Sequence, residues 1–163
     1  MNQEDYIKEL ELQKHPEGGF FKETYRSSLT ISMNGFEGDR NFLTSIYFLL
    51  EANQVSHFHR IKSDELWYFH GGSPCRVHQI DVNGNHSYFD LGIDLHGNQR
   101  PFTFVPSGNI FGAEPLGTFT LVSCAVAPGF DFQDFTLLTT PELMRLYPKH
   151  EQLIKKFSKE KYQ

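Results

Sequence analysis

Two histidines separated by one residue, His57 and His59, form the part of the sequence with the clearest chemical potential. Side chains alternate between the two faces of an extended strand, so both imidazoles are expected to point the same way. An acid follows at Asp64 or Glu65, where the next strand can return a carboxylate to the same place. Two imidazoles and a carboxylate suit a first-row divalent metal, and they also suit proton transfer with a bound molecule. The spacing therefore predicts a metal site or an acid–base site.

The segments that must position these residues are typical of strands placed between terminal helices. Apolar residues at helical spacing predict a helix over residues 3–13, which the Pro and Gly of residues 15–19 end. Another helix is expected to start at Thr140, with this Thr as its N-cap and Pro141 in the first helical position. Between the helices, apolar patterns predict strands over residues 20–26, 43–50, 75–82, 86–91, 102–106, 118–127 and 132–138.

Short strands at regular intervals indicate an all-β sandwich or barrel. The chain has 163 residues, a length that one domain with its own core can fill. We therefore expect a single domain over residues 1–163, with a β-core at about 18–139 and a helical segment at about 141–158.

Composition narrows the class of protein. The 16 Phe and 7 Tyr favour half-buried strands. The formal net charge is −5, and no cluster of Lys and Arg is present to meet phosphates, so no nucleic-acid partner is expected. The sequence shows neither a signal peptide nor an apolar run of bilayer length, so no membrane partner is expected. Cys75 and Cys124 lack metal-type spacing and suggest packed thiols in a reducing compartment, which makes a cytoplasmic location the expectation.

Several segments together resemble a known family. The His57-x-His59 pair, the following acid and Gly71 resemble the first motif of the cupins, and residues 104–111, with their Pro-x-Gly turn, resemble the second. Five ordered segments are similar to the fifth cupin domain family, at residues 15–19 with 23–27, 58–60, 64–67, 105–108 and 126–130. This resemblance implies a double-stranded β-helix, the cupin jelly roll, with a cavity between its sheets and usually a homodimer. It implies no known substrate.

One position departs from the metal-binding cupins. Those proteins complete their ligand set with a histidine three residues after the Pro-x-Gly glycine, where this chain has Phe111. Three candidate ligands remain, His57, His59 and Glu65, and they could hold iron, manganese, nickel or zinc. Glu65 is preferred over Asp64 as the cavity acid. A cavity without metal or another cofactor is the favoured interpretation.

Without a metal, the resemblance extends to sugar-nucleotide epimerases, which are jelly rolls with a histidine base. By that analogy His59 is the base, Glu65 its orienting partner, and Tyr25 or Tyr68 the proton donor. Arg26 would hold an anionic group. The predicted function is binding of a small polar metabolite with isomerase- or epimerase-type chemistry on a sugar-like carbonyl compound. Two alternatives stay open, a non-catalytic ligand-binding cupin and a metal-dependent oxygenase or hydrolase.

Other residues have both a functional and a structural interpretation. His59 and Glu65 can also be an internal hydrogen-bonded pair, and His57 a partly exposed strand residue. Glu23 and Arg26 lie three apart, which on a regular strand puts them on opposite faces and argues against an ion pair in the cavity. The remaining histidines have no evident partner in the sequence. The full set of ligand-contact candidates is Glu23, Arg26, His57, Trp67, Phe104, Phe111 and Asp131.

Overall fold

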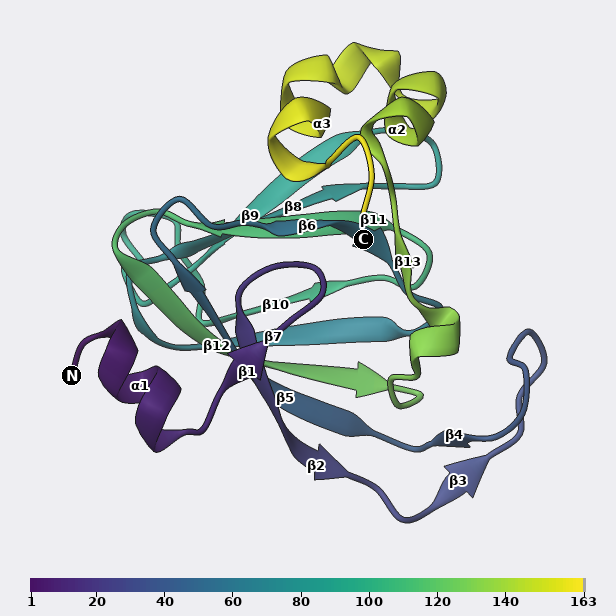
Figure 1. Cartoon of the computed structure of the whole chain (residues 1–163), viewed down its shortest axis with the longest axis horizontal. Coiled ribbons are helices and arrows are strands. Elements are labelled where there is room, and N and C mark those ends of the chain that lie inside the picture. The colour runs from purple at the N-terminus through teal and green to yellow at the C-terminus, as the bar shows by residue number, and fades with distance from the viewer. Residues whose placement is uncertain (163) are drawn as a thin grey trace.

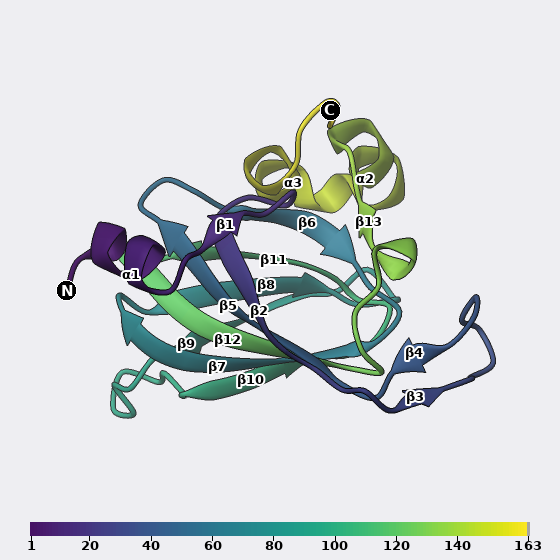
Figure 2. The ribbon, with the colours of Figure 1, turned by 60° about the horizontal axis from the view of Figure 1, so that its bottom comes forward.

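Two antiparallel sheets pack face to face in the computed structural model, which describes residues 1–162 (Figure 1). The larger sheet has the strand order β1 (Gln13–Lys14), β2 (Phe20–Arg26), β5 (Thr44–Glu51), β12 (Phe119–Ala127), β7 (Asp64–Gly72) and β10 (Phe102–Val105). The smaller sheet has the order β13 (Thr136–Leu137), β6 (Ser56–Arg60), β11 (Ile110–Pro115), β8 (Cys75–Ile80) and β9 (His86–Leu91). A separate hairpin, β3 (Thr30–Ile31) and β4 (Arg40–Asn41), projects from the body of the molecule (Figure 2). The expected all-β jelly roll is confirmed.

The space between the sheets is filled by inward-facing side chains of alternate strand positions. Phe48, Trp67, Phe111 and Val122 are almost completely buried in one cluster. The Trp67 ring meets the rings of Phe48 and Phe111 edge-on, at centroid distances of 6.1 and 6.5 Å. Aromatic pairs of this geometry bury large apolar areas, so this cluster closes one part of the barrel and leaves the rest for a cavity.

Short helices cover the ends and one face of the barrel. The helix α1 (Gln3–Glu9) lies at the N-terminus, and a capping box of Asn2 and Asp5 starts it. The helices α2 (Thr140–Leu146) and α3 (Glu151–Phe157) cover the outer face of the smaller sheet (Figure 1), joined by the 3-10 turn η2 (Pro148–His150). Ile154 and Phe157 pack there against Phe58. None of the helices in residues 1–162 is both long and apolar enough to cross a bilayer.

Three sequence expectations change at the element ends. The first helix stops at Glu9 rather than at residue 13. The last helical segment begins one residue earlier than expected, because Thr139 is the N-cap in a capping box with Glu142. Part of the strand expected over residues 132–138 is instead the 3-10 turn η1 (Phe132–Asp134), because the Asp131 side chain accepts a hydrogen bond from the Gln133 backbone N–H.

Candidate functional site

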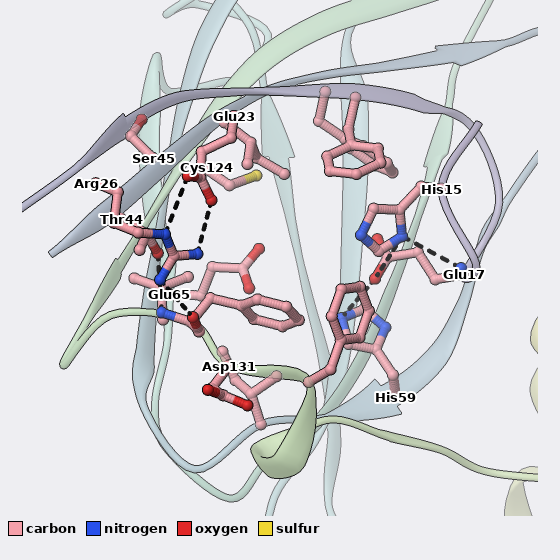
Figure 3. A pocket seen from close by; sticks show the side chains of 17 residues that line it. His15, Glu17, Glu23, Arg26, Thr44, Ser45, His59, Glu65, Cys124 and Asp131 are labelled. Atoms are coloured by element: carbon pink, nitrogen blue, oxygen red, sulfur yellow. Dashed lines mark hydrogen bonds and ion pairs between the residues drawn. The ribbon is translucent and has the colours of Figure 1, made fainter. Parts of the chain in front are cut away.

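A cavity of about 320 Å³ lies between the sheets, near the ends of β2, β5 and β12 (Figure 3). Its polar residues form two groups. His15, Glu17 and His59 lie on one side, and Glu23, Arg26, Glu65 and Asp131 lie toward the other (Figure 3). The other residues that line it are Phe21, Thr44, Ser45, Ile46, Phe48, Ile61, Cys124, Val126, Phe130 and Phe132.

The buried end of the cavity is built around the carboxyl group of Glu17. Its Oε2 lies 3.1 Å from Nε2 of His59 and 3.6 Å from Nδ1 of His15. Its Oε1 accepts a hydrogen bond of 2.7 Å from the Ser56 hydroxyl. The side chains of Glu17 and His59 are only 9% and 2% exposed. The two groups therefore interact with little screening by water.

Hydrogen bonding decides where the protons of this pair lie. Nδ1 of His59 is 2.7 Å from the His57 carbonyl oxygen, which can only accept, so Nδ1 carries a proton. Burial lowers the pKa of His59 to about 4, which leaves a lone pair on Nε2, facing Glu17. Burial raises the pKa of Glu17. Burial therefore favours the uncharged forms of both groups, in which the Glu17 carboxyl group donates to the imidazole.

His15 completes this end as a second neutral imidazole. Its Nδ1 accepts a hydrogen bond of 3.2 Å from the Glu17 backbone N–H, so the ring proton is on Nε2. Burial lowers the pKa of His15, and the opposing effect of the Glu17 carboxyl group is smaller. The ring rests edge-on against Phe21 at a centroid distance of 4.6 Å. His15 thus offers a hydrogen-bond donor and no positive charge.

Glu65 on β7 is a second buried carboxyl group in the cavity. Burial is the main cause that raises its pKa to about 8, the neighbouring Glu17 carboxyl group adds to the rise, and a hydrogen bond with Cys124 lowers it only in part. The adjacent Asp64 points outward, where its Oδ1 accepts a hydrogen bond from the Ser107 backbone N–H. Glu65 is therefore protonated at neutral pH and can donate to a bound molecule.

The exposed end of the cavity contains an ion pair between Glu23 and Arg26. Nε and Nη2 of Arg26 donate to the two carboxylate oxygens of Glu23, at 3.0 and 2.7 Å. The expectation that these residues face opposite sides is wrong, because β2 contains a bulge: Glu23 pairs with Ile46, yet Tyr25 pairs with Ser45. The extra residue, Thr24, returns Arg26 to the face of Glu23.

His57 lies outside this cavity. Its backbone N–H and its Nδ1 are 2.8 and 2.6 Å from the carbonyl oxygen of Glu17, and its ring packs near Tyr162. It borders a second, more open hollow on the outside of the barrel. The backbone of Glu17 runs beside His57 while the side chain of Glu17 reaches His59, so the two histidines do not converge on one point.

The other candidates also divide between core and surface. Trp67 and Phe111 are buried in the core, and the Phe111 ring packs 4.1 Å from the His59 ring, centroid to centroid. Tyr25, Tyr68 and Phe104 are 53%, 40% and 51% exposed and do not line the cavity. The homodimer that the family resemblance implies stays a prediction.

The described residues do not form the metal site that the sequence left open. Across residues 1–162, no three or more His, Cys, Asp or Glu side chains are arranged to hold a metal ion. His57 is turned away, and Phe111 packs on His59 where the fourth cupin ligand would stand.

Sequence reasoning missed His15, Glu17 and Ser56. Residues 15–19 belong to the segments that resemble the cupin family, but their sequence pattern predicts only the end of a helix and not a functional site. The contact between Ser56 and Glu17 joins residues 39 positions apart, which no local pattern reveals. The useful signal was the presence of His and Glu beside a Gly–Gly turn in a resembling segment.

Comparisons with known proteins agree with the fold. Residues 4–138 match the family described as Cupin superfamily (DUF985). The uncharacterized protein YML079W of Saccharomyces cerevisiae is 33% identical over 148 residues, covering 81% of this chain and 73% of the yeast protein. The sequence resemblance to cupins is confirmed.

Solved structures give the same result. The crystal structure of protein SO0799 from Shewanella oneidensis has 42% identity and a TM-score of 0.91, over 99% of both chains. A hypothetical protein from Leishmania major has 35% identity and a TM-score of 0.92, over 98% of this chain and 99% of that one. A variant of Bacillus subtilis oxalate decarboxylase, at 16% identity and a TM-score of 0.58, matches 91% of this chain and 38% of its own length, a likeness of fold alone.

Proposed function

Because the chain belongs to the Cupin superfamily (DUF985), whose jelly roll hosts many unrelated chemistries, we propose a function from its own cavity. The cavity binds a small polar metabolite and moves a proton on it, as isomerases and epimerases of sugar-like carbonyl compounds do. The observation that carries this proposal is the 3.1 Å contact of Glu17 Oε2 with His59 Nε2 inside an accessible cavity.

The pair can act as a base with its proton already placed. When the Oε2 proton of Glu17 moves to Nε2 of His59, Glu17 becomes a carboxylate that accepts a proton from a C–H group beside a carbonyl. Ser56 donates to Oε1 and holds the carboxyl group in position. The His57 carbonyl oxygen accepts from Nδ1 and stabilises the imidazolium formed.

Glu65 supplies the complementary acid. Its pKa of about 8 keeps a proton on the carboxyl group at neutral pH, which can pass to the carbonyl oxygen as charge develops there. Return of a proton to a neighbouring carbon, or to the other face of the same carbon, completes the isomerisation. The number of protons on substrate and protein is the same before and after, and no oxidant or reductant is required.

Hydrogen exchange at carbon tests this proposal. Aldoses, ketoses and other carbonyl metabolites are incubated with the protein in D₂O, and NMR follows loss of the C–H signal beside the carbonyl. We expect exchange with the natural protein and with a Glu114→Gln control, and no exchange with Glu17→Gln of unchanged melting temperature. Exchange that survives Glu17→Gln would overturn the assignment.

A non-catalytic ligand-binding cupin is the second candidate function. One observation favours it: among residues 1–162, no tyrosine lines the cavity, so the tyrosine acid of sugar-nucleotide epimerases has no counterpart there. This candidate predicts that native mass spectrometry detects a retained metabolite, released by Glu17→Gln, while no compound exchanges hydrogen at carbon.

A further inference from the structure

Acidic side chains outnumber basic ones around the cavity. Four carboxyl groups line it, those of Glu17, Glu23, Glu65 and Asp131. Among the lining residues within the described part of the chain, Arg26 is the only arginine or lysine. An acidic lining of this kind selects the charge of a ligand, because charges of one sign around a concave site reinforce one another there.

The guanidinium of Arg26 is already engaged. Beyond its two bonds to Glu23, its Nη1 donates to the Asn41 side chain at 2.7 Å and to the Phe130 carbonyl oxygen at 3.2 Å. Four of the five N–H donors that an arginine possesses are therefore occupied. An incoming carboxylate or phosphate would have to displace Glu23 to form a bidentate pair, and would leave that carboxylate without a partner.

The two imidazoles add no positive charge. Nδ1 of His15 accepts from the Glu17 backbone, which requires a neutral ring, and any charge on His59 is balanced by the Glu17 carboxyl group 3.1 Å from its Nε2. The pair of Glu17 and His59 has no net charge whichever of its two groups holds the proton between them, and Glu65 with its pKa of about 8 is uncharged at pH 7, so Glu23, Asp131 and Arg26 leave the lining with one net negative charge. The arginine that the sequence suggested as an anion holder thus neutralises a neighbour instead.

The apolar part of the lining is rich in aromatic rings. Phe21, Phe48, Phe130 and Phe132 all border the cavity. Aromatic rings combined with carboxylates attract ammonium groups, through the negative potential of the ring faces and the charge of the acids. The same combination gives an anion no positive charge with which to pair.

We propose that the molecule bound in this cavity carries a positively charged ammonium nitrogen, which lies among Glu65, Asp131 and the phenylalanine rings. The proposal rests on the proposed function only in taking the cavity as a binding site. It excludes carboxylates and phosphates as the group that anchors the ligand, and it directs the search for substrates toward amino derivatives of carbonyl compounds.

A series of probes that match in shape and differ in charge tests the proposal. The probes are choline, its neutral isostere 3,3-dimethylbutan-1-ol, and the anion 3,3-dimethylbutanoate, each titrated at pH 7 with ligand-detected NMR. We expect choline to bind about tenfold more tightly than the neutral isostere, and the anion to bind most weakly. Equal affinities, preference for the neutral or anionic probe, or no binding of choline would overturn the proposal.

Two variants locate the effect. Asp131→Asn removes one cavity charge and should reduce the preference for choline, while Glu9→Gln, an equal charge change on the exposed face of α1, should leave it unchanged. A preference that both variants reduce equally would show a general charge effect and overturn the site. The hydrogen-exchange assay remains independent, so exchange at carbon without cation preference would leave the proposed function standing and remove only this inference.

Discussion

Two histidine–glutamate pairs of nearly equal geometry occur in this chain, one in the cavity and one on the outer face of the smaller sheet. His59 Nε2 lies 3.1 Å from Glu17, and His78 Nε2 lies 3.3 Å from Glu114. The pKa of each histidine is lowered to about 4, with burial as the main cause. The two pairs therefore have the same residue types, similar N–O distances and the same lowered imidazole pKa.

Their surroundings make them different. Glu114 has a second partner, Lys156 of α3, which supplies a positive charge, whereas Glu17 has the Ser56 hydroxyl and two neutral imidazoles. His78 is covered by the Phe157 ring at 4.9 Å and shares a 3.0 Å contact with His86, while His59 lines the cavity. The outer pair joins α3 to the smaller sheet, and the inner pair borders a cavity in which the proposed function needs a transferable proton. Two features therefore separate the pairs: a lysine that pairs with the glutamate of the outer pair, and the cavity that gives a small molecule access to the inner pair.

The largest expected difference between the pairs is in activity. His59→Asn should lower the rate of hydrogen exchange at carbon by about 10²- to 10⁴-fold, the usual contribution of a general acid–base group. His78→Asn should leave the rate nearly unchanged, because that imidazole lies outside the cavity. Rates measured by NMR in D₂O check this. Equal losses from both substitutions would erase the functional distinction.

The outer pair should be the more sensitive to loss of packing. Phe157→Ala removes a buried ring that lies 5.1 Å from Phe58 and covers His78, and should lower the free energy of unfolding by about 3–5 kcal/mol. Urea denaturation measures this. The folded fraction should keep its ligand affinity, since Phe157 does not line the cavity. A parallel loss of affinity would mean that the two sites are coupled.

Both histidines should make the protein less stable in acid. Both have a folded-state pKa of about 4, below the usual value of 6.5, so the unfolded chain binds more protons between these values. The free energy of unfolding should therefore fall as the pH drops from about 6.5 to about 4. His59→Asn and His78→Asn should each flatten that slope in urea titrations across this range. A slope that neither substitution changes would contradict the neutral assignment of both rings.

Glu65 should produce the opposite trend between pH 4.5 and about 8. Its folded-state pKa is raised from 4.5 to about 8, so the folded chain holds a proton that the unfolded chain releases. This contribution is present below pH 4.5 and is lost as the pH rises toward 8. Glu65→Gln should remove the decline in unfolding free energy over that range. An unchanged decline would indicate that Glu65 is ionised in the folded protein.

Metal content should show the smallest effect. Untagged protein incubated with iron, manganese, nickel or zinc should retain no stoichiometric metal by elemental analysis, and His59→Asn should not alter the result. One equivalent per chain, lost in His59→Asn, would convert the inner pair into a metal site and return oxygenase or hydrolase chemistry to consideration.

The fold was accessible from sequence because side-chain alternation and turn residues are local signals. The Asn83–Gly84 turn lies between β8 and β9, and the continuous apolar run of β5 lies at the centre of its sheet. Only one member of the inner pair could be predicted from the sequence. The spacing identified His59, but its predicted partner, Glu65, is wrong, because Nε2 of His59 contacts Glu17. The contact between His59 and Glu17 depends on the packing of residues 15–19 beside β6, where the His57 backbone N–H donates to the Glu17 carbonyl oxygen. Local sequence patterns do not reveal such tertiary packing.

The bulge at Thr24 makes the content of the cavity depend on residue count as well as on residue identity. Two relatives could keep both a glutamate and an arginine in this strand and differ by one residue between them. Their composition would match, yet the arginine of one would face solvent and its glutamate would be free to meet a ligand. The placement of a single alignment gap in β2 therefore carries information about ligand charge that conserved letters alone would conceal.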